Sequence, residues 1–274
     1  MSSPPDAPSS RRRWRASVLV RASFVTHVAG ATLAVARPSL WPMIVSGLVA
    51  DHALLAAAGL WPRSRLLGPN WIRLPAAAVA QRQIAVTIDD GPDPDVTPQL
   101  LDILERSGAH ASFFCIGERV AAHPQLAREI VRRGHTLENH SLRHLHRFSL
   151  LGPRAMRSEV ERAQQVISAT VGESPRFFRA PAGLRNPFLD PILTNLGLRL
   201  ASWTRRGFDT VTREPDRVLA RLVRGLRSGD IVLLHDGHAA RTASGVPVAI
   251  EVLPRLLDAI MAARLTTVTL RATL

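Results

Sequence analysis

Two groups of side chains in this sequence have the types and spacing needed for metal-assisted chemistry. Asp89 and Asp90 are adjacent at the end of an apolar run and are followed by a Gly-Pro turn. Neighbouring carboxylates repel each other unless a cation holds them. His140 and His144 are four residues apart, so one turn of helix would bring both imidazoles to one face. A carboxylate with two imidazoles suits zinc and other late divalent ions.

Three further polar groups follow runs that resemble strands. Arg179 requires a carboxylate partner if it is buried, because an unpaired buried charge is strongly destabilising. Asp209 lies beyond the run that ends at Trp203, and His235 directly follows four apolar residues. A lone histidine is more often a satisfied core residue than a catalytic one. Polar groups at five strand ends change that expectation, because parallel strands bring their C-terminal ends to one edge.

The elements that must position these groups alternate along residues 82–274. We expect strands at 83–88, 111–116, 135–138, 176–180, 198–203, 230–235 and 266–270. We expect helices at 96–107, 124–133, 153–171, 187–196, 214–228 and 246–263. This alternation predicts an α/β fold with a mostly parallel sheet, either doubly wound or closed as a barrel.

The N-terminal third differs in composition from the rest. Residues 1–15 read as a disordered basic tail, and residues 16–75 as a hydrophobic helical segment. This segment holds two apolar stretches of about 20 residues, the length that spans hydrocarbon as a helix. Three interpretations of this segment are possible: a secretory signal, a pair of buried soluble helices, or a membrane hairpin. Arg21 and Asp51 count against the hairpin, but its length and flanking arginines favour it.

The arginines also predict an orientation for such a hairpin. They lie before the first apolar stretch and after the second, so the positive-inside rule places the body at the cytoplasmic face of a bacterial inner membrane. A periplasmic or secreted enzyme is the alternative. The net charge of +13 comes from arginine alone, since the chain has no lysine. The few aromatic residues do not interleave with the arginines, so we expect an anionic membrane surface as partner and no nucleic acid.

Composition excludes several other kinds of chemistry. The chain has neither tyrosine nor lysine, so neither a tyrosine general acid nor a lysine Schiff base can operate. Cys115 is the single cysteine, which excludes a disulfide framework and a thiolate-based zinc cluster. We expect it to be a buried thiol, because its neighbours are apolar.

Residues 82–274 resemble the NodB-homology polysaccharide deacetylases, carbohydrate esterase family 4. The resemblance rests on five motifs that occur in order. They are Thr87-Ile88-Asp89-Asp90-Gly91-Pro92, His140-Ser141-Leu142-Arg143-His144, Arg179-Ala180-Pro181-Ala182, Asp209-Thr210 and Leu233-Leu234-His235. It implies a distorted (β/α) barrel with about seven parallel strands. Ala182 and Thr210 stand where the family has tyrosine and tryptophan, and these changes bear on the substrate more than on the reaction.

The resemblance also implies roles for the motif residues. Asp89 would be the general base and His235 the general acid, while a divalent ion, expected to be Zn²⁺ with Co²⁺ or Ni²⁺ as alternatives, would bind between them. Arg179 would orient Asp89, and Asp209 would brace Arg179. The implied metal ligands are Asp90, His140 and His144, and the implied substrate or oxyanion contacts are Pro181, Ala182 and Leu233.

Together these observations predict a metal-dependent hydrolase. We expect it to remove an N-acyl group, in the first instance acetyl, from an amino sugar of a polysaccharide or a lipid-linked glycan. The alternative is a non-catalytic glycan-binding barrel that serves envelope polysaccharide assembly or export.

Overall fold

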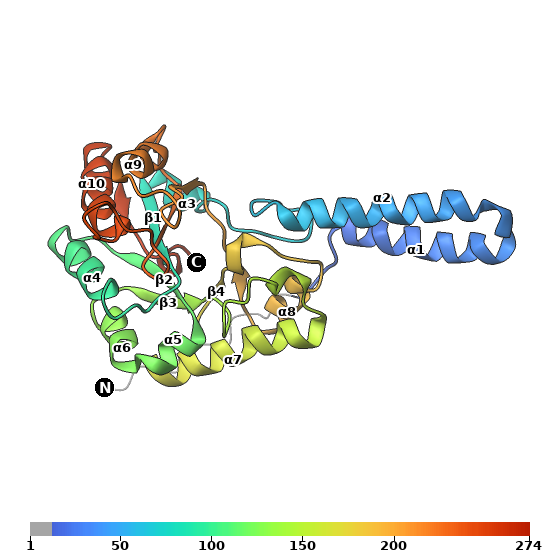
Figure 1. Ribbon diagram of the computed structural model, residues 1–274, viewed down its shortest axis with the longest axis horizontal. Coiled ribbons are helices and arrows are strands. Elements are labelled where there is room, and N and C mark those ends of the chain that lie inside the picture. Colours follow the sequence, from blue (N-terminus) through green and yellow to red (C-terminus); the bar gives the residue numbers. More distant parts are fainter. Residues whose placement is uncertain (1–12) are drawn as a thin grey trace.

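The computed structural model describes residues 13–274, in which a curled parallel sheet lies between layers of helices and an N-terminal helical pair projects away from it (Figure 1). The strands occur in the order β5-β4-β3-β2-β1-β7-β6, and β8 pairs with β1. All of these strand pairs are parallel. The predicted distorted barrel of about seven parallel strands is confirmed. The strands are β1 (Gln83–Asp89), β2 (Ala111–Cys115), β3 (Thr136–Asn139), β4 (Phe177–Phe178), β5 (Arg199–Leu200), β6 (Arg205–Arg206), β7 (Ile231–His235) and β8 (Thr266–Thr267).

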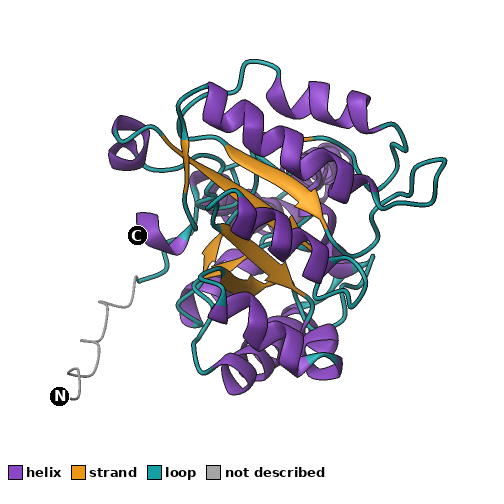
Figure 2. Cartoon of the chain, turned by 90° about the vertical axis from the view of Figure 1, so that its left-hand side faces the viewer, coloured by secondary structure: helices purple, strands orange, loops and turns teal. Residues whose placement is uncertain are grey.

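The central strands are the most apolar part of the sheet. β2 and β7 are buried along their whole length, and β1 is buried from Ile84 onward. A parallel sheet covered by helices on its faces buries both sides of each strand, so its strands read as continuous apolar runs. Figure 2 shows this arrangement, with helices around the strands. Cys115, at the end of β2, is a fully buried thiol as expected.

The outer strands depart from the sequence prediction. The run 198–203 forms a strand only at β5, and β6 follows it as a separate two-residue strand that was not predicted. β6 contains two arginines and therefore has no apolar signal. Its pairing with β7 is what makes it a strand, and that pairing is a tertiary contact.

The long helices lie close to their predicted positions. The prediction of 153–171 matches α7, whose end is marked by Gly172 at φ 77°. Short helices α3 and α5 were missed, because a helix of five or six residues shows too little periodicity. The helices of the body are α3 (Ala76–Ala80), α4 (Thr97–Arg106), α5 (Gly117–Ala122), α6 (Pro124–Arg132), α7 (Pro153–Val171), α8 (Leu189–Asn195), α9 (Pro215–Val223) and α10 (Val248–Ala262).

The two apolar stretches form α1 (Val18–Ala36) and α2 (Trp41–Leu60), an antiparallel hairpin joined by the short turn at Pro38–Leu40. Both helices have the length and composition to cross a membrane. Only 6% and 11% of their apolar windows are buried among the described residues, so these helices are not part of the core of the body. Asp51 faces α1 and accepts a hydrogen bond from Ser23 Oγ at 2.7 Å.

The end of the hairpin and the residues that follow it dock on the body. The Arg185 amide donates to Gly59 O at 3.1 Å, and the Arg185 guanidinium donates to Ser64 O at 2.6 Å. Ser202 Oγ donates to Pro62 O at 2.6 Å. The hairpin is therefore held at a defined position on the body. The tail predicted for residues 1–15 lies, apart from residues 13–15, outside the described residues.

Candidate active site

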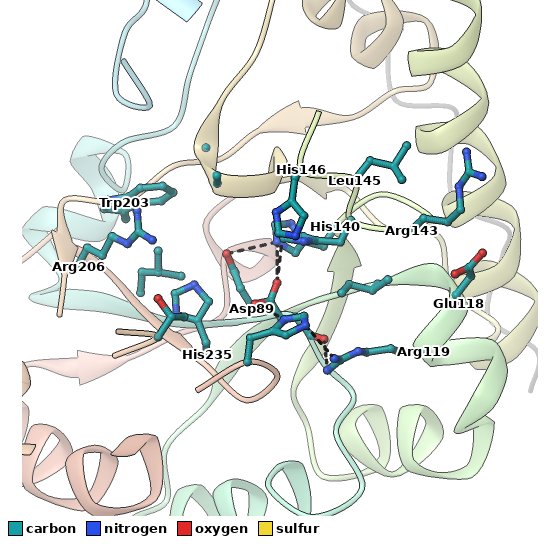
Figure 3. Close-up of a pocket in the computed structure, with 18 residues that line it drawn as sticks. Asp89, Glu118, Arg119, His140, Arg143, Leu145, His146, Trp203, Arg206 and His235 are labelled. Carbon is teal, nitrogen blue, oxygen red and sulfur yellow. Dashed lines mark hydrogen bonds and ion pairs between the residues drawn. The ribbon is translucent and has the colours of Figure 1, made fainter. Parts of the chain in front are cut away.

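Residues from several strand ends line one cavity of about 630 Å³ at the C-terminal edge of the sheet. Asp89 ends β1 and His235 ends β7, and the two are register partners on neighbouring strands. His140 follows β3 directly, and Arg179 follows β4. The parallel pairing thus brings together residues that are far apart in sequence, as Figure 3 shows for Asp89, His140 and His235.

Asp90, His140 and His144 present their ligand atoms to one point. The Nε2 atoms of His140 and His144 each lie 3.3 Å from Asp90 Oδ1. These groups can place their ligand atoms within 4.8 Å of one another. Asp90 Oδ1 is buried and has no hydrogen-bond partner among the described residues. A divalent cation would satisfy that oxygen, so the donor set fits a metal ion.

The tautomer of His140 supports the same interpretation. Its Nδ1 lies 2.9 Å from the carbonyl oxygen of Arg179, and a carbonyl can only accept a hydrogen bond. The proton therefore resides on Nδ1, which leaves the lone pair on Nε2, the atom that faces Asp90. Backbone carbonyls commonly fix metal-binding histidines in this way.

His140 and His144 are not joined by the helical turn that their spacing would allow. The segment is an irregular loop in which Ser141 and His144 have φ of 66° and 52°. Asn139 Oδ1 accepts from the Ser141 amide at 2.9 Å, and Ser141 Oγ accepts from the His144 amide at 3.0 Å. These local hydrogen bonds stabilise a tight turn instead of a helix. The two imidazoles still meet, with ring centroids 4.8 Å apart.

The titration behaviour of these groups follows from their burial and mutual contacts. Burial alone would raise the pKa of Asp90, but the neighbouring His140 and His238 imidazoles hold it well below its ordinary value. Burial opposes the charge on His140, yet Asp89 and Asp90 raise its pKa. Burial and then His140 lower the pKa of His144 to about 4. A neutral His144 is available as a ligand at physiological pH.

Arg179 is fully buried and contacts Asp89. Its Nη1 donates to Asp89 Oδ1 at 2.5 Å and to Thr87 Oγ1 at 2.9 Å, and its Nη2 donates to Ser202 O at 3.0 Å. The guanidinium carbon lies 4.0 Å from the centroid of the Phe114 ring. Burial lowers the pKa of Arg179, which Asp89 opposes. The expected contact between Arg179 and Asp89 is therefore present.

Asp209 does not contact Arg179 as the resemblance implied. Its Oδ1 lies 3.0 Å from His235 Nδ1, and its Oδ2 accepts from the His235 amide at 2.8 Å. The carboxylate is fully buried, so both oxygens are committed to His235. Although burial opposes the charge, Asp209 raises the pKa of His235 to about 9. Asp209 thus braces the histidine, because the loop after β6 passes beside the end of β7.

The remaining predicted residues occupy different positions. Ala182 and Leu233 line the cavity, as does Thr210. Ala182 adopts a left-handed backbone with φ 54°. Pro181 is buried at the start of the same turn and is not part of the cavity wall.

Sequence reasoning missed several residues of the cavity. His238 Nδ1 lies 3.2 Å from Asp90 Oδ2, and Arg119 donates to the backbone carbonyl of Asp90 at 3.0 Å. Trp203 and Arg206 form another part of the wall. The His-Asp-Gly-His spacing was a usable signal for His238, whereas Arg119 lies on α5, which carried no motif.

Comparisons with known proteins agree with this geometry. The family model described as polysaccharide deacetylase matches residues 76–201. A peptidoglycan-N-acetylglucosamine deacetylase of Bacillus cereus is 34% identical over 178 residues, which are 64% of this chain and 82% of that protein. A chitooligosaccharide deacetylase of Bradyrhizobium sp. is 35% identical over 158 residues, 57% of this chain and 72% of the relative.

Solved structures share the fold. A family 4 carbohydrate esterase from Streptomyces lividans, in complex with acetate, has 30% identity and a TM-score of 0.61, covering 68% of this chain and 91% of the other. A CE4 family pseudoenzyme from Bacillus anthracis has a TM-score of 0.66 at 21% identity, covering 75% of this chain and 68% of the other. The latter likeness concerns the fold alone.

Proposed function

Because this chain belongs to the polysaccharide deacetylase family, we propose that it is a metal-dependent hydrolase that removes an N-acyl group, typically acetyl, from an amino sugar of a glycan. The observation that carries the proposal is the convergence of five side chains on one cavity. Asp90, His140 and His144 form a ligand set, and Asp89 and His235 flank it from neighbouring strands.

Asp90, His140 and His144 are the proposed ligands of the metal ion. One carboxylate and two imidazoles suit Zn²⁺, with Co²⁺ or Ni²⁺ as alternatives. A divalent ion in this place supplies Lewis-acid polarisation of the acyl carbonyl and lowers the pKa of a water molecule. The ligand role of His140 requires its proton on Nδ1, where the Arg179 carbonyl holds it.

Asp89 is the proposed general base. Its Oδ1 accepts a hydrogen bond from the Arg179 guanidinium, and this contact fixes the direction of the carboxylate. Its second oxygen, Oδ2, lies 3.8 Å from His140 Nε2 and so beside the ligand set. From there it takes a proton from the water that attacks the acyl carbon. The developing oxyanion lies near the backbone amide of Ala182 in this proposal.

His235 is the proposed general acid. Asp209 accepts a hydrogen bond from the Nδ1–H group, so the protonated ring has its second N–H, at Nε2, available for the substrate. A pKa of about 9 keeps His235 charged at neutral pH, which suits a group that must protonate a departing amine. Asp89 and His235 thus hold separate proton-transfer roles. Pro181 shapes the turn that carries Ala182, and Leu233 contributes an apolar contact for the substrate.

Two variants test this assignment. Asp89→Asn keeps the shape of the side chain, so it should retain the metal and release acetate about 10²–10⁴-fold more slowly from an N-acetylglucosamine oligomer. His140→Ala should lose the metal by elemental analysis, whereas His110→Ala, an exposed histidine outside the cavity, should keep both metal and activity.

The same measurements separate the enzyme from its alternative. A non-catalytic glycan-binding barrel would release no acetate whether or not it binds metal. Full activity of Asp89→Asn would remove Asp89 from the base role. Unchanged metal content in His140→Ala would reject the ligand set.

The substrate is proposed to be a lipid-linked N-acylated glycan, with a wall polysaccharide as the alternative. The hairpin has the composition of a membrane anchor, and the segment that follows it passes beside a residue that lines the cavity. A Cβ on Gly183, a cavity residue, would lie 2.7 Å from Pro62 and 2.6 Å from Trp203. The cavity therefore adjoins the anchor. We place the protein in the inner membrane with its body on the cytoplasmic face, since arginines flank the hairpin on the side of the body.

A further inference from the structure

Arg206 projects into the cavity from β6 and is not used by the proposed reaction. Successive side chains of a strand point to opposite faces. Arg205 accordingly turns away, where it pairs with Asp230 and reaches the carbonyl oxygens of Arg224 and Gly225. Arg206 instead forms part of the cavity wall. In the view of Figure 3 it lies with Trp203 on the side of His235, away from Arg119.

Two aromatic rings hold the Arg206 guanidinium in place. Its central carbon lies 5.4 Å from the centroid of the Trp203 ring and 5.0 Å from that of the Phe208 ring. Such contacts favour a cation over an aromatic face and leave the edges of the guanidinium free to donate. Phe208 adopts φ 62°, an uncommon conformation for a bulky residue, and its side chain remains 45% exposed. The strained residue thus places a ring beside the arginine without burying that ring.

The charge of Arg206 is not neutralised by any carboxylate among residues 13–274. Arg206 forms no ion pair within that range, whereas its neighbour Arg205 pairs with Asp230, and the Arg206 Nε has no hydrogen-bond partner there. Other cavity arginines differ. Arg143 pairs with Glu159 at 2.6 Å, and Arg119 approaches Asp93 at 3.9 Å. The guanidinium of Arg206 therefore faces the cavity without a counter-ion among the described residues, and an anionic ligand there would supply one.

We propose that Arg206 binds an oxyanion of the glycan, a phosphate or a carboxylate, attached near the sugar whose N-acyl group is removed. This inference rests on the proposed function and specifies its substrate class as an anionic glycan. A planar guanidinium donates two parallel hydrogen bonds to either oxyanion, and the aromatic contacts preorganise it for that purpose. The cavity thereby combines a site for the amide with a site for a negative charge.

The experiment compares three forms of one N-acetylglucosamine disaccharide: the neutral methyl glycoside, the 1-phosphate, and a glycoside that ends in a carboxylate. The protein is the full chain loaded with metal. We expect kcat/KM for at least one anionic form to exceed that for the neutral form by about 10- to 100-fold, the range for a hydrogen bond to a charged group. Whichever anionic form is preferred identifies the oxyanion as phosphate or carboxylate.

Arg206→Gln should abolish this preference, so that kcat/KM for the anionic form falls to the level of the neutral form, because the variant removes a charge-assisted contact that only the anionic form makes. Arg217→Gln is the matched control. Arg217 is an exposed arginine on α9 that does not line the cavity, so its loss removes the same charge without touching the site. Arg217→Gln should retain the preference.

Binding is measured in parallel from the quenching of tryptophan fluorescence, since Trp203 adjoins Arg206. If no form is hydrolysed but the anionic form binds through Arg206, the inference holds and the proposed function fails. If all forms are hydrolysed at equal rates, the function holds and the inference is overturned. Equal loss of preference in Arg217→Gln also overturns it, because the effect would then come from overall charge.

Discussion

Asp209 and His235 form a buried pair that defines what the proposed acid can do. Both carboxylate oxygens of Asp209 bind His235, one at the ring and one at the backbone amide. The ring is therefore fixed in direction and in tautomer. Burial disfavours its charge, but Asp209 together with Asp89 and Asp90 outweighs that effect and raises the pKa of His235 to about 9. The acid is thus protonated throughout the neutral range.

This pair predicts the alkaline side of the pH profile. His235 must carry its proton to act, so kcat/KM should fall as the pH rises through about 9. Asp209→Asn removes the carboxylate that favours the charged ring, while burial remains, so the alkaline limb should move to lower pH. The measurement is kcat/KM for deacetylation between about pH 6 and about pH 10, a range that includes the expected change.

An exposed aspartate gives the control for that profile. Asp216→Asn, which changes a side chain on α9 far from the cavity wall, should leave the limb in place. An alkaline limb at the same pH in Asp209→Asn would mean that another group limits the reaction.

At the scale of elements, the end of α2 is where the hairpin meets the body. Gly59 lies in the last turn of α2, and a Cβ at this position would lie 2.1 Å from the carbonyl oxygen of Arg185. The amide of Arg185 also donates to Gly59 O. Close approach of two backbones therefore requires glycine here, since any side chain would separate them.

Gly59→Ala should loosen this junction. The added methyl group forces a backbone shift that costs about 1–3 kcal/mol. For a chain of this size, the midpoint of thermal unfolding should fall by roughly 2–4 °C per kcal/mol. The measurement is thermal unfolding of the full chain in detergent.

The matched control is Gly47→Ala in the same helix. A Cβ at Gly47 meets no atom within 4 Å, so alanine should leave stability unchanged or raise it through its better helix propensity. Equal behaviour of the two variants would show that the junction does not contribute to stability.

At the scale of the whole molecule, the projecting hairpin and the distribution of charge are the basis for the membrane location and orientation that we propose. Large apolar side chains cover the outside of the hairpin, among them Phe24 at 69% and Val49 at 63% exposure. Exposed apolar surface of this extent marks contact with a membrane or a partner. Arg13 and Arg15 precede α1, and Arg63 and Arg65 follow α2, whereas Arg37 lies in the far turn; this excess beside the body is the basis of the proposed cytoplasmic orientation.

Cysteine labelling in spheroplasts of a bacterial host tests this orientation. Ser39→Cys lies at the far turn of the hairpin and Ser244→Cys on the body, and both positions are exposed. A membrane-impermeant maleimide should label Ser39→Cys in intact spheroplasts and Ser244→Cys only after lysis. The natural Cys115 is buried and should not react.

Each other labelling pattern has a clear meaning. Labelling of Ser244→Cys alone before lysis would place the body outside the membrane. Labelling of both positions before lysis would show that the hairpin does not cross the bilayer.

Much of this protein could be predicted from the sequence because the relevant signals are local. Apolar runs gave the central strands, since a buried parallel strand must be apolar along its length. Short motifs at strand ends located Asp89, Asp90, His140 and His235 together, because parallel strands end at one edge. The length of the apolar stretches gave the hairpin.

The tertiary structure alone decided the features that depend on long-range contacts. Asp209 binds His235 instead of Arg179, and β6 forms through its pairing with β7. Arg206 contacts two aromatic rings and no carboxylate among the described residues. None of these has a local signature, because each depends on which strand or loop packs beside another. Sequence spacing limits which groups can meet, but the packing of distant segments selects the pairs that do.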